Sequence, residues 1–167
     1  MLTIIASMER ELSGLWREIS SVSSGSDLRM AVVGIGKSRS QAGVRSILNA
    51  GSGGTPRQLL MLGFAGAVDQ ELHTGDLVLS SRYHVESPGK EFLTPDAAMW
   101  QNGLLAAANA GLPMHHLDSL TVDEVVSTPA AKAALAEEYR VGIVEMEDYW
   151  LAEAAQEARV PFISARA

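Results

Sequence analysis

Acidic side chains follow directly after an apolar run in the stretch VGIVEMEDYWLAEAA, residues 141–155. Glu145 and Glu147 stand where this run gives way to a helical pattern, and Asp148 and Glu153 follow them. Glu147 would open that helix with its side chain on the inward face. A carboxylate there can accept two hydrogen bonds at once, which suits the paired hydroxyls of a ribose. The alternative is that these acids only complement the helix dipole.

Glu11 is a second candidate, one turn into another predicted helix. It lies three residues after Met8 and four before Leu15, so it borders the apolar stripe of that helix. The positive end of the helix dipole stabilises a carboxylate at this place, and such a group can act as a general base that deprotonates water. The alternative is a first-turn glutamate that only complements the dipole, because acidic residues are common there.

Two glycine-rich turns follow predicted strands. Gly34 and Gly36 in VGIGKSRSQAG resemble part of a dinucleotide-binding fingerprint, but Arg39 stands where its last glycine is needed. The turn could instead direct backbone N–H groups at an anion or a hydroxyl. Gly63 and Gly66 in MLGFAGAVDQ would let the backbone approach a flat ligand closely. The alternative at both turns is that the glycines serve only the direction of the chain.

Asp123 follows a further predicted strand and precedes Val125 and Val126 in TVDEVV. One carboxylate beside two β-branched side chains could form the wall of a pocket for a ring. The alternative, that the valines belong to the core, is the commoner role of such residues.

These residues must be positioned by an alternation of short β-rich runs and helical patterns. Strands are predicted at 2–6, 28–36, 58–62, 77–81, 117–122, 141–144 and 161–167, with 28–36 buried. Helices are predicted at 8–19 with Ser7 as N-cap, and at 38–50, 95–111, 128–139 and 145–158, with loops at 20–27 and 51–57. This order indicates an α/β fold, a three-layer αβα sandwich with a mixed, largely parallel central sheet. Ligands of such sheets bind at the carboxyl ends of strands, where the candidate residues fall.

Composition narrows the classes of function. The chain has 167 residues, and its net charge of 13 − 20 = −7 without any Lys/Arg run argues against a nucleic-acid partner. Cysteine is absent, and the histidines, including a predicted loop pair at His115 and His116, lack metal-ligand spacing, so we expect no metal site. No apolar run reaches the roughly 20 residues of a membrane helix, and LTIIAS is too short for a signal peptide. We therefore expect a cytoplasmic protein without a membrane span.

Several motifs in order resemble the purine/uridine phosphorylase superfamily, and within it the methylthioadenosine/S-adenosylhomocysteine nucleosidase branch. The motifs are SMERE, VGIGK, LGFAGAV followed by TGDLVLS, then RYH, VDEVV, VEMED and VPFISARA, and they span most of the chain. SMERE, GIGK and VEME are the most specific of them. The resemblance implies an enzyme that acts on a purine nucleoside of the 5′-substituted adenosine type, works as a homodimer and needs no cofactor.

The resemblance also implies roles for individual residues. Glu11 matches the glutamate that activates water in this family. Met146 and Glu147 match its ribose site, with Glu147 on the ribose hydroxyls and Glu145 in the same strand-end turn. The residues expected at the base pocket are Phe64, Ala65, Gly66, Asp123, Val125 and Val126.

Hydrolysis of the glycosidic bond is favoured over phosphorolysis. Phosphorolytic relatives carry arginines for phosphate in the first strand–helix loop and ahead of the third-strand glycine turn, whereas those places here read ASMERE and MLGFAG. A catalytically impaired nucleoside-binding homologue and a phosphate-dependent phosphorylase are the alternatives.

The chain departs from the family pattern at three places. Phe64 stands where the family usually has Ser or Thr, and Val125 where it usually has Phe. The family also continues past the last strand to an Asp that protonates the purine and then to a closing helix, whereas this sequence stops at Ala167. We therefore expect one nucleosidase-like domain over residues 1–167 that is truncated at its C-terminus and lacks that helix and that acid.

Overall fold

The strands form one mixed sheet in the computed structural model, which describes residues 1–22, 28–49 and 57–167. In order of pairing they are β2 (Leu28–Val32), β1 (Leu2–Ala6), β3 (Gln58–Gly63), β8 (Phe162–Arg166), β5 (Leu77–Val85), β6 (Met114–Thr121), β7 (Ile143–Glu145) and β4 (Gly66–Ala67). The pairs β5–β8 and β4–β7 are antiparallel, and the other pairs are parallel. The predicted mixed, largely parallel sheet is confirmed.

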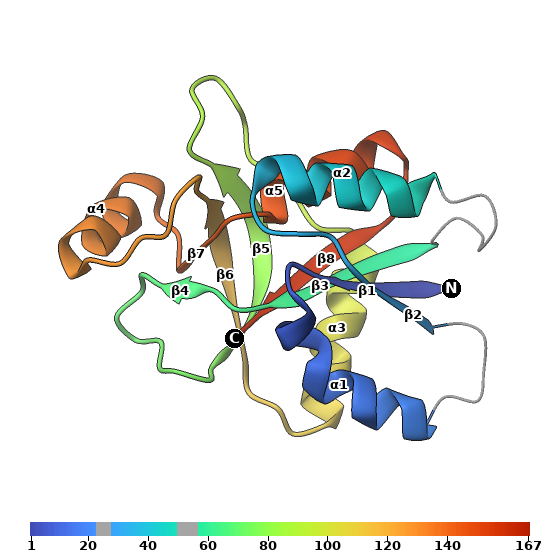
Figure 1. The fold of residues 1–167 in the computed structure, drawn as a ribbon. Coiled ribbons are helices and arrows are strands. Elements are labelled where there is room, and N and C mark those ends of the chain that lie inside the picture. Colours follow the sequence, from blue (N-terminus) through green and yellow to red (C-terminus); the bar gives the residue numbers. More distant parts are fainter. Residues whose placement is uncertain (23–27, 50–56) are drawn as a thin grey trace.

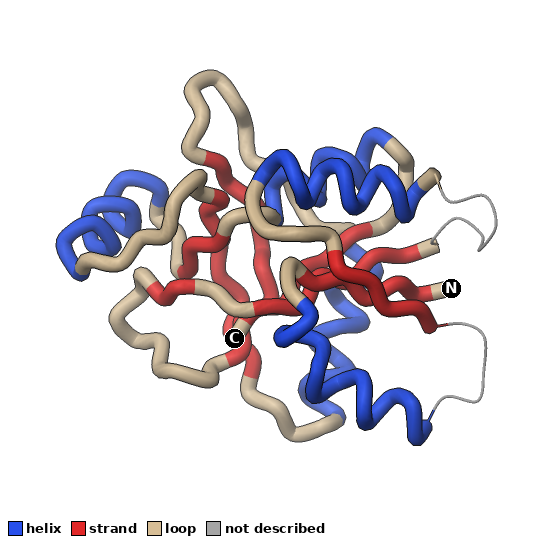
Figure 2. Tube along the Cα trace, in the orientation of Figure 1, coloured by secondary structure: helices blue, strands red, loops and turns tan. Residues whose placement is uncertain are grey.

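Helices cover both faces of this sheet (Figure 1). α2 (Lys37–Leu48) and α5 (Asp148–Glu157) lie on one face, and α1 (Glu9–Val22) and α3 (Ala97–Asn109) lie on the other. Neighbouring residues of β1 show the two layers, because Ile5 packs in the cluster that contains α2 and α5, while Ile4 packs with Leu12 of α1. Figure 2 shows the same helix–sheet–helix layering, so the predicted three-layer sandwich is confirmed.

The remaining helix, α4 (Pro129–Tyr139), packs beside the β7 end of the sheet. Thr128 caps it by accepting a hydrogen bond from the N–H of Ala131 at 3.3 Å, and Pro129 occupies the first position, as the sequence predicts. Residues 122–128 connect β6 to α4, so α4 directly follows the segment that carries Val125 and Val126.

Two assignments at the N-terminal half are wrong. The hydroxyl of Ser7 forms no hydrogen bond with any described residue, and α1 instead begins at Glu9, with the side chain of Glu11 accepting from the N–H of Met8. β2 is an edge strand whose residues are only partly buried, with Val32 43% exposed, because only β1 pairs with it.

Two assignments at the C-terminal half are also wrong. His115 and His116 lie in β6 rather than in a loop, because β6 begins at Met114 to pair with the full length of β5. The last helix begins at Asp148 and not at Glu145, because Glu145 still pairs with Thr121 of β6 as the final residue of β7.

The predicted loops at 20–27 and 51–57, and the end of the predicted helix at 38–50, fall largely on residues 23–27 and 50–56, which lie outside the described residues. Within the described part of the chain, no helix combines the length and apolar character needed to cross a membrane.

Candidate active site

A cavity of about 330 Å³ opens where β1, β3 and β7 end. This is the edge of the sheet at the carboxyl ends of its parallel strands, where the turns that follow those strands lie. Every predicted site residue except Asp123 lines it, namely Glu11, Phe64, Ala65, Gly66, Val125, Val126, Glu145, Met146 and Glu147. Asp123 is exposed and does not line this cavity.

The carboxylate of Glu11 is fixed by two backbone donors from different elements. The N–H of Met8 donates to Oε2 at 2.8 Å, and the N–H of Phe64 donates to Oε1 at 3.0 Å. The first turn of α1 is thereby tied to the end of β3. Because both donors are backbone groups at strand ends, the position of this carboxylate depends on the sheet and not on a mobile loop.

Arg166 approaches Glu11 across Gly63. β8 pairs in parallel with β3 and sets Arg166 opposite Gly63. A Cβ atom at Gly63 would lie 2.6 Å from Nη1 of Arg166 and 2.7 Å from Oε1 of Glu11. Only a glycine therefore allows the guanidinium and the carboxylate to flank the same small space. A water molecule placed between this acceptor and this donor would be both oriented and open to deprotonation.

Sequence reasoning missed Arg166 as a functional residue. The available signal was a lone cation at the end of the apolar run VPFISARA, which follows the helix whose start carries the cluster of carboxylates. Arg166 is 2% exposed, and its guanidinium meets three buried carboxylates. Nη2 lies 3.2 Å from Glu145 and 3.5 Å from Glu147, and it also donates to Asp148.

Burial alone would lower the pKa of Arg166, but Asp148, Glu145 and Glu147 together raise it above the ordinary value of arginine. The guanidinium is therefore a permanent positive charge inside the fold. It faces three acidic groups, so the cluster carries a net negative charge when every carboxyl is ionised.

The pKa of Glu145 lies well above the ordinary value of a carboxyl. Burial raises its pKa, and the neighbouring Asp148 raises it further, whereas Arg166 and the hydroxyl of Thr121 lower it, with a net value of about 8. Both of its oxygens are already occupied. Oε1 accepts from Thr121, and Oε2 accepts from the N–H groups of Glu147 and Asp148 at 2.6 Å each.

Glu147 lines the cavity, and both of its oxygens have donors within the protein. Its Oε1 accepts from the N–H of Gly36 at 2.9 Å, and its Oε2 lies 3.5 Å from Arg166. Gly34 and Gly36 have φ angles of 94° and 77°, which aim the backbone of this turn at the carboxylate. The turn at 34–36 therefore holds an acidic side chain of the protein and is not free to wrap a phosphate.

Apolar side chains make up the other side of the cavity. Ile35, Phe64 and Val125 are 42%, 52% and 80% exposed, which is unusual for large apolar residues. Val126 and Met146 pack partly against the cluster that includes Val144 and Leu120. The cavity thus joins a buried, charged side with an open, apolar one.

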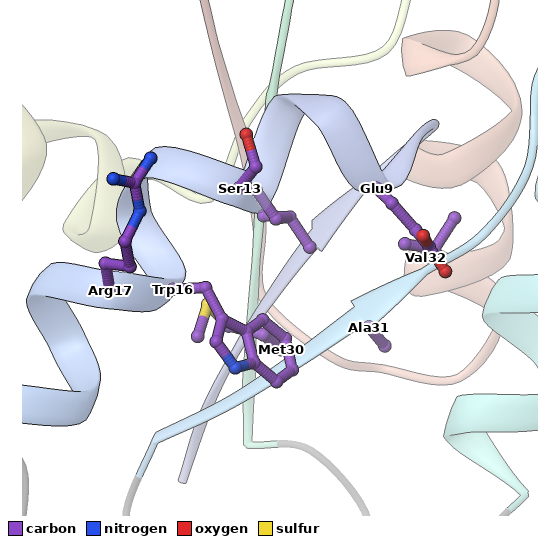
Figure 3. Close-up of a pocket in the computed structure, with 8 residues that line it drawn as sticks. Glu9, Ser13, Trp16, Arg17, Met30, Ala31 and Val32 are labelled. Atoms are coloured by element: carbon purple, nitrogen blue, oxygen red, sulfur yellow. The ribbon is translucent and has the colours of Figure 1, made fainter.

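A larger cavity, of about 620 Å³, lies elsewhere between α1 and the edge strand β2 (Figure 3). Figure 3 shows side chains from both elements projecting into it, among them Trp16 and Met30. Among the described residues, Glu9 is the only carboxylate in its lining, and no second acid or positioned base accompanies it there. We therefore place the chemistry in the smaller cavity, where three carboxylates converge with a buried arginine nearby.

Among the residues that the structure describes, no group of three or more His, Cys, Asp or Glu side chains is arranged to hold a metal ion. The carboxylates of the cavity are satisfied by N–H, O–H and guanidinium donors instead. Arranged in this way, the site can hold hydroxyl groups and activate water, which are the requirements of group transfer from a sugar.

Comparison with known proteins agrees with the fold. The sequence model described as "Phosphorylase superfamily" matches residues 13–167, and the chain belongs to that superfamily. It is accordingly an enzyme of the nucleosidase or phosphorylase type. The matched range contains Gly63, Glu145, Glu147 and Arg166, while Glu11 precedes it.

Similar solved structures give the same architecture. The 5′-methylthioadenosine/S-adenosyl homocysteine nucleosidase of Campylobacter jejuni has a TM-score of 0.86 at 22% identity, over 99% of this chain and 83% of that one. A mutant futalosine hydrolase of Helicobacter pylori has a TM-score of 0.86 at 17% identity, over 99% and 88%. A mutant Helicobacter pylori nucleosidase with 5′-methylthioadenosine in its active site has a TM-score of 0.87 at 18% identity, over 99% and 83%.

Proposed function

We propose that this chain hydrolyses the N-glycosidic bond of a purine nucleoside of the 5′-substituted adenosine type and releases the free base. The observation that carries the proposal is the placement of Glu11 and Arg166 on the same side of Gly63, next to Glu147. The names of the similar nucleosidases and of the futalosine hydrolase support a nucleoside as substrate.

In this mechanism Glu147 accepts hydrogen bonds from the ribose hydroxyls. Glu145 keeps the turn in place through its bonds to the N–H groups of Glu147 and Asp148. As the bond between the sugar and the base breaks, its electron pair goes to the base and positive charge grows on the ribose. The carboxylates stabilise that charge. Water held beside Gly63 adds to C1′ and gives its proton to Glu11.

The base is proposed to lie against Phe64, Ala65, Gly66, Val125 and Val126, which line the apolar side of the cavity. Met146 would contact the sugar from the same turn as Glu147. Asp123, predicted for this pocket, is exposed in the structure, so we assign it no role in the proposed mechanism.

Phosphorolysis is the less favoured candidate because of the charge around the cavity. Its lining contains Glu11, Glu145 and Glu147 and no Lys or Arg. Arg166, just behind that lining, is engaged by three carboxylates. A phosphate dianion would meet repulsion from the ionised carboxylates, and among the described residues no cation lines the cavity to compensate it.

The test is chromatographic detection of free base after incubation with 5′-methylthioadenosine or futalosine, each with and without phosphate. We expect release of the base in both conditions, and Glu11→Gln should lower the rate by ~10²–10⁴-fold. Glu9→Gln, in the same helical turn, is the matched control and should keep the activity. Release only with phosphate, or full activity in Glu11→Gln, would contradict the proposal.

The single continuous sheet supports the inference that residues 1–167 act as one nucleosidase-like domain. The homodimer and the cytoplasmic location stay predictions. Sedimentation equilibrium of the purified chain would measure the first.

A further inference from the structure

The turn at 34–36 donates a hydrogen bond to Glu147, the proposed ribose ligand. The N–H of Gly36 lies 2.9 Å from Oε1 of Glu147. Each carboxylate oxygen can accept two hydrogen bonds, so this donor orients Glu147 and still leaves acceptor positions for the hydroxyls of a ribose. Gly36 precedes α2 and Glu147 precedes α5, so the hydrogen bond depends on how the starts of these two helices are held together.

Lys37 connects the starts of these two helices. It is the first residue of α2 and directly follows Gly36. Its Nζ lies 3.9 Å from the centre of the indole ring of Trp150, which belongs to the first turn of α5 and is 4% exposed. An ammonium group over the face of a tryptophan is attracted to it, and the attraction is stronger where water is excluded. The contact therefore ties the residue after Gly36 to the helix that begins after Glu147.

A second ammonium group on the same ring provides an internal comparison. Nζ of Lys90 lies 5.2 Å from the centre of the Trp150 ring. Lys90 also pairs with Glu153 on α5, and it belongs to the connection between β5 and α3. Lys90 therefore holds its own loop to α5, whereas Lys37 is covalently joined to the residue that donates to Glu147.

Packing holds the two helices together but does not hold the turn. α2 and α5 contribute to one hydrophobic cluster and lie side by side on the sheet (Figure 1), and Nε2 of Gln41 donates to Glu153 at 3.3 Å. These contacts begin about one helical turn beyond Gly36. A Cβ atom at Gly36 would meet nothing within 4 Å, and the neighbouring Ile35 is 42% exposed. The turn itself therefore has little packing around it and depends on its polar contacts and on Lys37.

We propose that Lys37 is a positioning residue, whose ammonium group on Trp150 holds the N–H of Gly36 against Glu147 and thereby sets how strongly the site selects a ribose. This rests on the proposed function, in which Glu147 accepts hydrogen bonds from the ribose hydroxyls. Lys37 does not line the cavity, so it acts through Gly36 and Glu147 and not on the substrate. Without the contact, the turn and the carboxylate must be ordered when the sugar binds, and that ordering lowers the affinity for the hydroxyls.

The experiment compares Lys37→Met and Lys37→Arg with the unaltered chain on 5′-methylthioadenosine and on its 2′,3′-dideoxy analogue, which lacks both hydroxyls. The ratio of the two kcat/KM values measures the preference for ribose, and the unequal lability of the two glycosidic bonds cancels when variants are compared. We expect Lys37→Met to lower this ratio about tenfold, through a loss on 5′-methylthioadenosine alone. Lys37→Arg should keep the ratio, because a guanidinium also binds the face of an aromatic ring.

Lys90→Met is the matched control, since it removes the other ammonium group from Trp150 and should leave the ratio unchanged. Equal losses on both substrates in Lys37→Met would mean that Lys37 supports the fold in general, and they would overturn the proposal. An unchanged ratio without any loss would overturn it as well. So would a ratio that falls equally in Lys37→Met and Lys90→Met.

Hydrogen exchange of the Gly36 amide tests the same contact without a substrate. Exchange at least tenfold faster in Lys37→Met than in the unaltered chain, with no change in Lys90→Met, would support the positioning role. Equal rates, or a Gly36 amide that is unprotected in the unaltered chain, would overturn it. If the dideoxy analogue is not cleaved, these rates decide on Lys37. If no nucleoside is cleaved, the proposed function fails, and the same rates still decide whether Lys37 holds the turn.

Discussion

The two sides of the active-site cavity are built in opposite ways. The carboxylate end, made of Glu11, Glu145, Glu147, Asp148 and Arg166, is held by hydrogen bonds from four different parts of the chain and is largely buried. The base wall, made of Phe64, Val125 and Val126, is apolar, with Phe64 52% and Val125 80% exposed.

The two sides therefore have different tasks: the carboxylate end is preorganised to stabilise the transition state, and the base wall contributes to recognition of the base. Charges that stabilise a transition state are most effective where water and side-chain motion are excluded, and the carboxylate end meets that condition. An open apolar wall supplies contact area but fixes little orientation. Changes at the carboxylate end should therefore alter stability and rate, whereas changes at the base wall should alter affinity alone.

Arg166→Met should give the largest effect on stability. It leaves Glu145, Glu147 and Asp148 buried without their cation, and breaking such a pair costs about 3–5 kcal/mol. The free energy of unfolding from urea titration measures this. Arg45→Met, which removes an exposed ion pair with Glu157, should cost below about 1 kcal/mol. Similar losses in the two variants would show that the carboxylate end does not depend on its arginine.

Gly63→Ala should abolish most of the activity. The new methyl group would have to displace Nη1 of Arg166 or Oε1 of Glu11, and a misplacement of about 1 Å costs about 10²-fold in rate. Initial rates of base release measure the effect. Gly14→Ala on α1 meets nothing within 4 Å and should leave the rate unchanged while stabilising the helix by about 0.5–1 kcal/mol. An active Gly63→Ala enzyme would mean that Glu11 and Arg166 need not flank one space.

Glu145 should make the folded state less stable as the pH rises. Its pKa is about 8 when folded against an ordinary value of 4.5, so the folded chain keeps a proton that the unfolded chain has released between these values. Stability therefore falls across that window and levels off above it. Glu145→Gln should flatten this part of the curve of unfolding free energy against pH, and the exposed Glu157→Gln should not. Identical slopes in Glu145→Gln and the unaltered chain would refute the raised pKa.

Val125→Phe should have the smallest effect and should act on binding only. An aromatic ring at this exposed place could stack on the purine, for about 0.5–1.5 kcal/mol, which corresponds to a several-fold lower KM. The melting temperature should not change. A changed melting temperature with an unchanged KM would reverse the assignment and place Val125 in the packing of the fold.

Much of the site was predictable because its residues stand at strand ends. Glu11, Glu147 and the glycine turns follow apolar runs in the sequence, and the sheet then brings those ends together. The partners of these residues were not predictable, since the register that sets Arg166 against Gly63 depends on β8 entering between β3 and β5. The burial of β2 was misjudged for the same reason, because its composition does not reveal that it is an edge strand.

The position of β8 also bears on how the chain acquires its shape during synthesis. β8 follows every other strand in the sequence but lies between β2–β1–β3 and β5–β6–β7–β4 in the sheet. Until it arrives, these two halves share no strand pairing, and Glu145, Glu147 and Asp148 have no counter-ion. The pairing of distant segments makes this step slow relative to local helix formation. A nascent chain that lacks β8 therefore holds two unjoined half-sheets, and the arrival of β8 both joins them and brings Arg166 to the three carboxylates.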